Sequence, residues 1–141
     1  GLYGVSCTGL PLKNAGTLKS IISHVREVAP GESVGYTRAG IITAPSRIAV
    51  IPLGYADGLD RRLGNRAGKV FINGSCVQII GNICMDICMA DVTGIDCKPG
   101  DEALFIGDPI PIAEVSAAAG TIPYEILTGI SHRVKRVYIQ E

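Results

Sequence analysis

The sequence predicts a mostly β fold, a barrel or sandwich of about six or seven short strands with one or two short helices near the C-terminus. Short runs rich in β-branched and apolar residues alternate with turns that contain glycine or proline. Asn73-Gly74 stands between two such runs and is typical of a type I′ hairpin, because both turn residues need positive φ. Helical apolar spacing occurs only toward the C-terminus, where Ile112, Val115 and Ala119 share one face.

Length and composition fit one domain with a core that needs no disulfide or metal, since the chain has 141 residues and is 47% hydrophobic. Thirteen basic and thirteen acidic residues cancel, and aromatic residues make up 5% of the chain, which argues against a nucleic-acid partner. The apolar runs fall far short of the roughly 20 residues of a membrane span, and no signal-peptide pattern opens the chain. We therefore expect a cytoplasmic protein with no membrane contact.

The N-terminal region divides into a connecting segment and the start of the domain. Residues 1–16 hold four glycines and a proline without sustained periodicity, so we expect a linker or the severed end of a preceding domain. The β domain should then occupy residues 17–141. Apolar and polar residues alternate over 17–28, which predicts one long strand, although a helix also fits this window. After a turn at Pro30-Gly31, residues 33–36 should return as a second strand.

The middle of the chain carries the clearest strand signals. Residues 46–53 are almost continuously apolar, which predicts a strand covered on both faces. Residues 60–68 contain three arginines and should form an exposed loop. The Asn-Gly hairpin should occupy 69–80, and a further strand is expected over 82–92.

The C-terminal region combines strands and helices. A strand is expected over 102–106, followed by a helix over 108–120 that opens with Asp-Pro and ends at glycine. A second short helix should hold residues 123–127 and stop at Gly129. The β-branched and aromatic residues of 134–139 predict a last strand.

The cysteines do not form a recognisable framework. They are Cys7, Cys76, Cys84, Cys88 and Cys97. An odd number at irregular spacing argues against a secreted disulfide scaffold. Two cysteines four positions apart on one strand would be separated by roughly 13 Å, beyond the reach of a disulfide or a zinc site. We expect five free thiols and no metal.

Five sequence blocks, in this order, resemble the C-terminal domain of pyridoxal-phosphate-dependent alanine racemases. They are Gly-Glu-Ser-Val-Gly-Tyr (31–36), Pro-Leu-Gly-Tyr-Ala-Asp-Gly (52–58), Gly-Asn-Ile-Cys-Met-Asp (81–86), Asp-Val-Thr (91–93) and Thr-Ile-Pro-Tyr-Glu-Ile-Leu-Thr-Gly-Ile-Ser (121–131). The resemblance covers nearly the whole chain but only part of a complete racemase. It implies a closed antiparallel barrel of Greek-key type.

The resemblance also implies roles for four residues. Tyr36 matches the tyrosine base that reaches into the partner subunit's site, and Tyr55 matches the tyrosine that lines the substrate entrance. Met85 matches the residue whose backbone amide meets the substrate carboxylate. Tyr124 matches the tyrosine that bonds the cofactor phosphate within the same chain. Without the resemblance, a tyrosine at a strand end is more often a packing residue with a hydrated hydroxyl, and a lone methionine is more often core.

Racemisation explains why the family needs such residues. Inverting the Cα of a cofactor-bound amino acid takes one base on each side of the planar carbanion. In the family, one base is the cofactor-bearing lysine of an N-terminal α/β barrel and the other is a tyrosine from the partner's C-terminal domain. The lysines of this chain are Lys13, Lys19, Lys69, Lys98 and Lys135. None of them lies in a cofactor-lysine motif, so the resemblance implies half an active site, inactive alone and completed by the barrel domain in a homodimer.

Some residues depart from the family pattern or lack a functional assignment. Asn82 and Ile87 stand where many relatives carry an arginine and a glutamine, and the departure at Asn82 leaves the catalytic positions intact but leaves the electrostatics near the substrate open. We interpret Asp86 as structural, and His24 and His132 as surface or packing residues.

Two alternatives to alanine racemisation for bacterial peptidoglycan remain open from the sequence. The enzyme could act on another small amino acid such as serine. A barrel of this size could also be a non-catalytic binding or dimerisation module.

Overall fold

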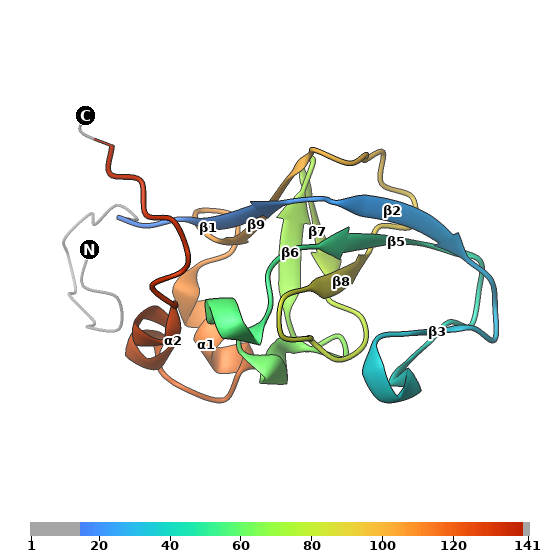
Figure 1. Cartoon of the computed structure of the whole chain (residues 1–141), viewed down its shortest axis with the longest axis horizontal. Helices are drawn as coiled ribbons and strands as arrows, with labels where there is room; N and C mark the ends of the chain where they lie inside the picture. The colour runs from blue at the N-terminus through green and yellow to red at the C-terminus, as the bar shows by residue number, and fades with distance from the viewer. Residues whose placement is uncertain (1–14, 140–141) are drawn as a thin grey trace.

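The computed structural model describes residues 15–139, so most of the connecting segment expected over 1–16 lies outside the described part. Figure 1 shows a mostly β body with both helices at one end. The strands are β1 (Leu18–Ile21), β2 (His24–Val28), β3 (Ser33–Val34), β4 (Gly40–Ile41), β5 (Ser46–Ile51), β6 (Lys69–Ile72), β7 (Ser75–Gln78), β8 (Cys88–Asp91) and β9 (Glu102–Ile106). The helices are α1 (Ile112–Ala118) and α2 (Pro123–Gly129), and short 3₁₀ turns cover Tyr36–Arg38, Tyr55–Asp57 and Arg61–Leu63.

Antiparallel pairing orders the strands into two main sheets, β1-β9-β6-β7 and β2-β5-β8, with β3 and β4 paired separately. A bridge between Ile79 and Ala90 joins the end of the first sheet to β8. Strands β6, β7 and β8 are therefore consecutive neighbours, and β5 returns beside β8, which is a Greek-key arrangement.

The strand predicted over 17–28 is divided into β1 and β2, which pair with different sheets. Ile22 N donates to Asp101 O at 2.8 Å, beside β9, whereas Ser23 N donates to Val50 O of β5 at 2.9 Å. Figure 1 shows β1 and β2 as one extended path across the top of the molecule. This path joins β1, at the outer end of one main sheet, to β2, at the outer end of the other, and the Ile79–Ala90 bridge connects the opposite ends of the two sheets. The side-chain alternation changes phase at the division, because Leu18 and Ile22 are buried whereas His24 is exposed.

The prediction of a strand over 82–92 is correct for β8 (Cys88–Asp91) and wrong for residues 82–87, which form a loop. Gly81 has a φ of 69° and turns the chain. Cys84 N then donates to Ile87 O at 2.9 Å and closes a tight turn around Met85 and Asp86. Ile83 and Cys84 are buried although they lie in a loop, so their apolar character marks burial and not a strand.

Two other strand predictions need correction. The strand expected over 33–36 ends at Val34, because Gly35 takes a φ of 81° before the 3₁₀ turn. Residues 134–139 form no strand, and Val137, Tyr138 and Ile139 are exposed. Their β-type composition finds no pairing partner within the described part of the chain.

The hairpin and both helices are confirmed. Asn73 and Gly74 have φ values of 45° and 85°, and they join the paired strands β6 and β7. Helix α1 begins later than expected, after Pro111, because Ile110 N donates to Gly107 O at 3.2 Å in a preceding turn. Gly120, with a φ of 67°, follows its end.

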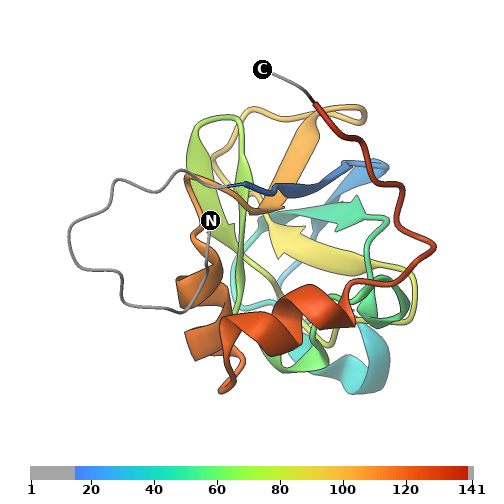
Figure 2. The same ribbon diagram turned by 90° about the vertical axis from the view of Figure 1, so that its left-hand side faces the viewer.

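The core fills the interior of the barrel and extends under the helices. Its largest fully buried side chain is Phe105 of β9, which packs with residues such as Ile51, Ile72 and Ile112 in one cluster. A second cluster, which includes Val34 and other buried residues, lies beneath the β3–β4 hairpin. Figure 2 shows α1 and α2 together at one side of the barrel.

Candidate functional site

The hairpin formed by β3 and β4 presents Tyr36 at its tip. Tyr36 opens the 3₁₀ turn and its side chain is 72% exposed. The two residues after it, Thr37 and Arg38, have φ values of 62° and 55°. Positive φ is uncommon for residues other than glycine, and two in succession mark a strained backbone. The surrounding chain must therefore hold this turn in place.

A side-chain amide bonds the Tyr36 turn to the loop that follows Gly81. Asn82 Nδ2 donates to Tyr36 O at 3.1 Å and to Thr37 Oγ1 at 2.9 Å. Thr37 Oγ1 in turn donates to Tyr36 O at 2.6 Å. On its other side, Asn82 Oδ1 accepts from Asn65 Nδ2 at 2.9 Å. These four residues form one hydrogen-bonded chain that ends at the carbonyl of Tyr36.

Glycines allow the hairpin to approach this loop backbone to backbone. A Cβ on Gly81 would lie 2.5 Å from Val34 O, and a Cβ on Gly40 would lie 2.9 Å from the same atom. A Cβ on Gly35 would lie 3.1 Å from Met89 Cε. Contacts under 3.0 Å leave no room for a side chain, so the first two positions require glycine for this approach.

Tyr55 and Met85 are brought together by the same kind of contact. Tyr55 N donates to Cys84 O and Ala56 N donates to Met85 O, both at 3.0 Å. A Cβ on Gly54 would lie 2.3 Å from Met85 O, so only glycine permits this approach. The side chains of Tyr55 and Met85 are 46% and 53% exposed. Two predicted site residues thus share one exposed face.

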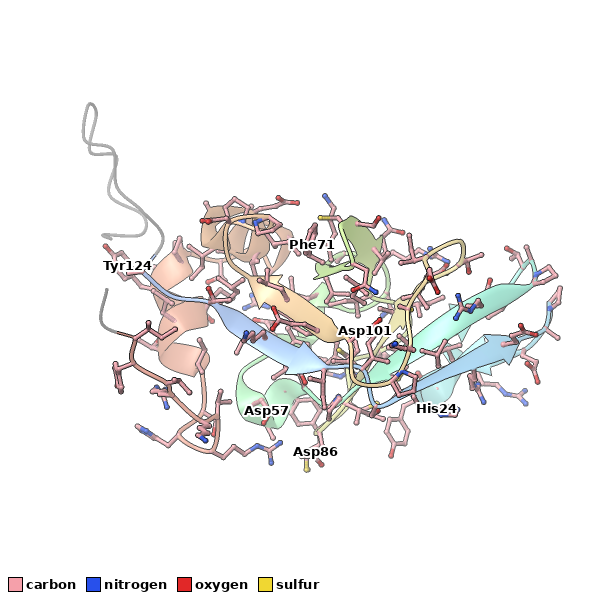
Figure 3. The ribbon with its side chains drawn as sticks, turned by 90° about the horizontal axis from the view of Figure 1, so that it is seen from above. His24, Asp57, Phe71, Asp86, Asp101 and Tyr124 are labelled. Atoms are coloured by element: carbon pink, nitrogen blue, oxygen red, sulfur yellow. The ribbon has the colours of Figure 1, made fainter. Side chains whose placement is uncertain are left out.

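An arginine from the C-terminal segment links the two loops that carry Tyr55 and Met85. Arg133 Nε donates to Asp57 Oδ1 at 2.7 Å, and Arg133 Nη2 donates to Asp86 Oδ1 at 2.6 Å. Asp57 Oδ2 also accepts from Gly54 N at 2.8 Å. Figure 3 shows Asp57 and Asp86 near each other at the edge of the barrel. Asp86 therefore has the structural role predicted for it.

The charges in this link shift the pKa values of its members. Burial raises the pKa of Asp57. The hydrogen bond from Arg133, the hydrogen bond from Gly54 N and the charge of Arg133 together lower the pKa by more than burial raises it, so it lies below its ordinary value. The hydrogen bonds to Asp57 and Asp86 raise the pKa of Arg133. Asp57 and Arg133 are therefore both charged near neutral pH.

Tyr124 lies on a different element, in the first turn of α2. Its side chain is 45% exposed, and in Figure 3 it is at the helical end of the molecule, away from Asp86. The C-terminal end of α2 is fixed to the Tyr55 turn, because a Cβ on Gly58 would lie 2.4 Å from Gly129 O and Ser131 N donates to Asp57 O at 3.0 Å. Tyr124 is thus placed relative to Tyr55 by the helix and not by direct contact.

The histidines and cysteines of the described residues lack the position or the chemistry of catalytic groups. His24 and His132 are exposed. Of the described cysteines, Cys76 is exposed and three are buried, all as free thiols. Burial, and then the nearby Cys84, raise the pKa of Cys88 and keep its thiol protonated. Within residues 15–139, no group of three His, Cys, Asp or Glu side chains is placed to hold a metal ion.

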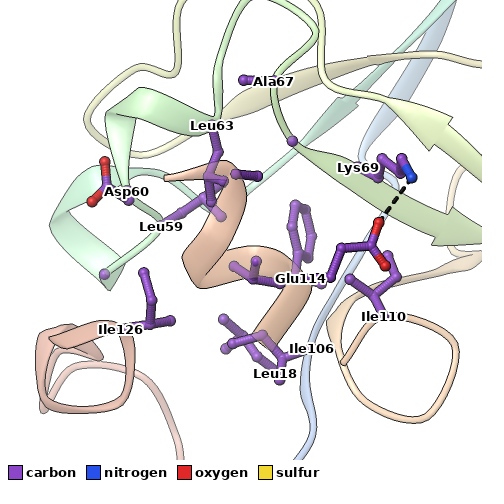
Figure 4. Close-up of a pocket in the computed structure, with 15 residues that line it drawn as sticks. Leu18, Leu59, Asp60, Leu63, Ala67, Lys69, Ile106, Ile110, Glu114 and Ile126 are labelled. Carbon is purple, nitrogen blue, oxygen red and sulfur yellow. Dashed lines mark hydrogen bonds and ion pairs between the residues drawn. The ribbon is translucent and has the colours of Figure 1, made fainter. Parts of the chain in front are cut away.

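A small apolar pocket at the helical end belongs to the core. Its lining includes Leu18, Leu59, Leu63, Phe105, Ile110 and Ile126. Figure 4 shows the ion pair between Lys69 and Glu114, with Nζ and Oε1 2.8 Å apart, beside it. None of the four predicted site residues lines this pocket. No helix in the described part of the chain is long and apolar enough to span a membrane.

Sequence reasoning missed three residues that organise this face. It gave no role in the site to Asn65, Asp57 or Arg133, and nothing in the spacing of positions 57, 86 and 133 indicates that they meet. The Gly-Tyr-Ala-Asp-Gly block did contain a signal for Asp57, which lies three positions after Gly54. A carboxylate at this spacing can accept a hydrogen bond from the glycine amide.

Known proteins with similar sequences place this geometry in one family. Residues 15–138 match the sequence model of the family described as alanine racemase, C-terminal domain. The alanine racemase of Clostridium novyi (strain NT) is 42% identical over 99% of this chain and 39% of that protein. The alanine racemase of Helicobacter pylori (strain Shi470) is also 42% identical, over 91% of this chain and 35% of that protein.

A solved structure agrees with these sequences. The crystal structure of alanine racemase from Bartonella henselae, with covalently bound pyridoxal phosphate, matches with a TM-score of 0.89 and 39% sequence identity. The match covers 97% of this chain and 39% of that chain. The chain therefore spans 39% or less of the length of each of these three relatives.

Proposed function

The chain belongs to the family of alanine racemase C-terminal domains, and from this membership we propose that it forms part of an enzyme that interconverts L-alanine and D-alanine with pyridoxal phosphate. In this proposal the chain supplies a tyrosine base and one wall of the substrate site. The observation that carries the proposal is the convergence of Tyr36, Tyr55 and Met85 on loops that are joined by Asn82 and by Arg133.

Tyr36 is the proposed base for one face of the substrate. When bound, pyridoxal phosphate delocalises the electron pair left at Cα and so acidifies the Cα hydrogen. The phenolic oxygen of Tyr36 would accept or return that proton on one side. A tyrosine has an ordinary pKa of about 10, so it needs neighbouring positive charge to act near neutral pH. The exposure of Tyr36 supports the proposal, because an exposed phenol is accessible to a surface outside this domain.

Met85 and Tyr55 are proposed to bind the substrate. Met85 N donates no hydrogen bond to any described residue, and it lies in the exposed turn that Ile87 O closes. A backbone amide left open in this way suits a carboxylate, which prefers several donors. Tyr55 would narrow the approach to the same amide, because its backbone is bonded to the residue just before Met85.

The residues of this chain fit a minor share of the cofactor site. The hydroxyl of Tyr124 bonds to none of the described residues, so it can donate to a phosphate oxygen. Lys19 and Lys69 are engaged with Glu102 and Glu114, at 2.6 Å and 2.8 Å. No lysine of this chain lies in a cofactor-lysine motif, so we assign the cofactor-bearing lysine, and the second base, to an N-terminal barrel domain of the same protein, in a homodimer that shares its sites between subunits.

The function can be tested with the full-length protein loaded with pyridoxal phosphate. Polarimetry should show L-alanine and D-alanine each converging to the racemic mixture. The same assay with L-serine and D-serine distinguishes the alternative substrate. If neither amino acid loses optical rotation while the protein is folded and binds the cofactor, the proposal is wrong.

A further inference from the structure

The position of the Tyr36 phenol depends on its backbone and not on packing of its side chain. The side chain is 72% exposed, and its hydroxyl bonds to no residue in the part of the chain that the structure describes. The 3₁₀ turn that carries it continues through Thr37 and Arg38, both at positive φ. Such a turn persists only where neighbouring groups hold it, so the group that holds it also decides where the phenol lies.

That group is the side-chain amide of Asn82. Its Nδ2 has two hydrogens, and it bonds to two acceptors of the turn, Tyr36 O and Thr37 Oγ1, at 3.1 Å and 2.9 Å. The carbonyl of Tyr36 is an acceptor only, so the amide must direct its nitrogen and not its oxygen toward the turn. Both donors of Asn82 are thus used on the residue that carries the phenol and on the residue after it.

Asn65 fixes that orientation. Its Nδ2 donates to Asn82 Oδ1 at 2.9 Å, and its backbone N donates to Gly81 O at 2.8 Å. Asn65 itself has a φ of 54°, a conformation that asparagine adopts more readily than most residues. Asn65 therefore binds both the backbone and the side chain of the Gly81-Asn82 pair, and it presents the Asn82 nitrogen to the turn.

We propose that Asn82, oriented by Asn65, is a positioning residue that sets the reach of the Tyr36 phenol toward the substrate Cα. This inference rests on the proposed function, because it assumes that Tyr36 transfers a proton. Asn82 touches no reacting atom and acts only through the backbone of the Tyr36 turn. Its removal should therefore slow proton transfer on the Tyr36 face and leave the opposite face unchanged.

The isotope effect separates this role from a general loss of structure. For the enantiomer whose Cα hydrogen faces Tyr36, a slower Tyr36 step makes removal of that hydrogen more rate-limiting, so the deuterium isotope effect on kcat/KM rises. For the other enantiomer, the opposite base removes the Cα hydrogen and Tyr36 then supplies the new proton. When this second step is slow, removal of the Cα hydrogen becomes reversible, so the deuterium isotope effect on kcat/KM falls. The values of kcat/KM must fall by the same factor in both directions, because the equilibrium between enantiomers is fixed.

The test uses the full-length holoenzyme with Asn82→Ala and with Asn82→Asp. The aspartate keeps the size of the side chain and the acceptor for Asn65 but cannot donate to the turn. Both variants should lower kcat/KM by about 10- to 100-fold, since a displacement of about 1 Å can cost about 10²-fold. Asn65→Gly, which tolerates positive φ, should cause a smaller loss with the same opposite changes in the two isotope effects.

Gln78→Ala is the matched control. It removes an exposed amide side chain whose Oε1 accepts from Arg66 Nη1 at 3.1 Å, away from the Tyr36 turn, and it should leave activity and isotope effects unchanged. Cofactor absorbance and melting temperature identify any variant that fails to fold. In that case the remaining two variants at Asn82 and Asn65 decide the question.

The outcomes distinguish this inference from the proposed function. If Tyr36→Phe retains wild-type activity, the role of Tyr36 fails and the inference fails with it. If Tyr36→Phe is inactive but folded variants of Asn82 have wild-type kcat/KM, only the inference is overturned. It is also overturned if activity falls while the isotope effects of the two enantiomers change in the same direction or not at all.

Discussion

Arg133 Nε donates to Asp57 Oδ1 at 2.7 Å and so joins the C-terminal segment to the Tyr55 turn, across 76 positions of the sequence. The same guanidinium bonds Asp86 in the Met85 turn at 2.6 Å. Asp57 is the better shielded partner, with 14% of its side chain exposed against 60% for Asp86. One cation therefore adds a side-chain link to the backbone hydrogen bonds that already join the two loops, which we propose to form the substrate wall.

Arg133→Ala should weaken both the fold and substrate binding in the full-length enzyme. The stability loss should be small, because solvent screens an ion pair whose arginine is exposed, and it should come mainly from the shielded partner Asp57. The KM for alanine should rise more than kcat falls, since the variant displaces binding groups and not the base. Thermal unfolding and steady-state kinetics measure both effects.

Two variants control this prediction. Arg133→Lys should not restore the wild-type values, because a single ammonium cannot bond two carboxylates with the geometry of a guanidinium. Lys135→Ala removes a nearby exposed charge and should have little effect. An unchanged KM in Arg133→Ala would show that the two loops keep their separation without the arginine.

Asp57 should contribute to stability in a pH-dependent manner. Its pKa in the folded protein is below the ordinary value of 3.8, since Arg133 and Gly54 N bond the carboxylate. A lowered pKa means that the contribution is fully present above the ordinary value and is lost as pH falls through the folded-state pKa. The difference in unfolding free energy between wild type and Asp57→Asn should therefore be constant near neutral pH and shrink below about pH 3.8.

Denaturant unfolding at several pH values measures this difference. Asp60→Asn is the matched control for the location of the charge, because the hydrogen bond from Arg62 lowers the pKa of Asp60 in a separate turn. It should show the same sign of pH dependence without any change in KM. A difference for Asp57→Asn that grows toward low pH would contradict the assigned charge state.

Tyr36→Phe should keep cofactor binding and lose racemisation in both directions. Removal of a positioned acid or base costs about 10² to 10⁴ in rate, and inversion of Cα needs both faces. The cofactor absorbance of the full-length variant and its kcat in each direction are the measurements. Wild-type rates in this variant would exclude Tyr36 as the base.

Mixed dimers test whether Tyr36 acts across subunits. A subunit with Tyr36→Phe is paired with a subunit that lacks the cofactor lysine. If each site takes its lysine from one subunit and its tyrosine from the other, one site has both defects and the other has none. Such dimers should recover about half of the wild-type activity. Purified mixed dimers as inactive as both parents, with cofactor still bound, would assign Tyr36 to its own subunit.

Residues 1–141 alone should form no specific cofactor complex, because the proposed cofactor lysine belongs to another domain. Titration with pyridoxal phosphate, followed by absorbance, should show only weak and unsaturable change from surface lysines. Lys98→Ala and Lys135→Ala should each reduce this background slightly. A stoichiometric, saturable change that one of these substitutions abolishes would refute the half-site interpretation.

Local sequence signals predicted the elements that local forces determine. The Asn73-Gly74 turn was predictable because its φ values exclude most other residues, and the strand within 46–53 was predictable because it is buried on both faces. The division of 17–28 was not, since it depends on the bond of Ile22 N beside β9 and the bond of Ser23 N to β5, which are distant in the sequence. A local pattern of apolar and polar residues does not determine which distant strand an amide bonds.

The site shows the same limit. The blocks around Tyr36, Tyr55 and Met85 indicated which residues to examine, and the structure brings Tyr55 and Met85 together through backbone contacts. The links made by Asn82 and Arg133 were not predictable, because each depends on long-range packing that places one side chain between two loops.

Among the described strands, β3 and β4 pair only with each other and belong to neither main sheet. A two-stranded ladder has little stability of its own, and this one depends on Val34 and Ile42 beneath it and on Asn82 beside it. It can open while every ladder of the barrel remains intact. Tyr36 therefore lies on a unit that should unfold locally, and if Tyr36 is the base that we propose, activity on warming should be lost before the barrel melts.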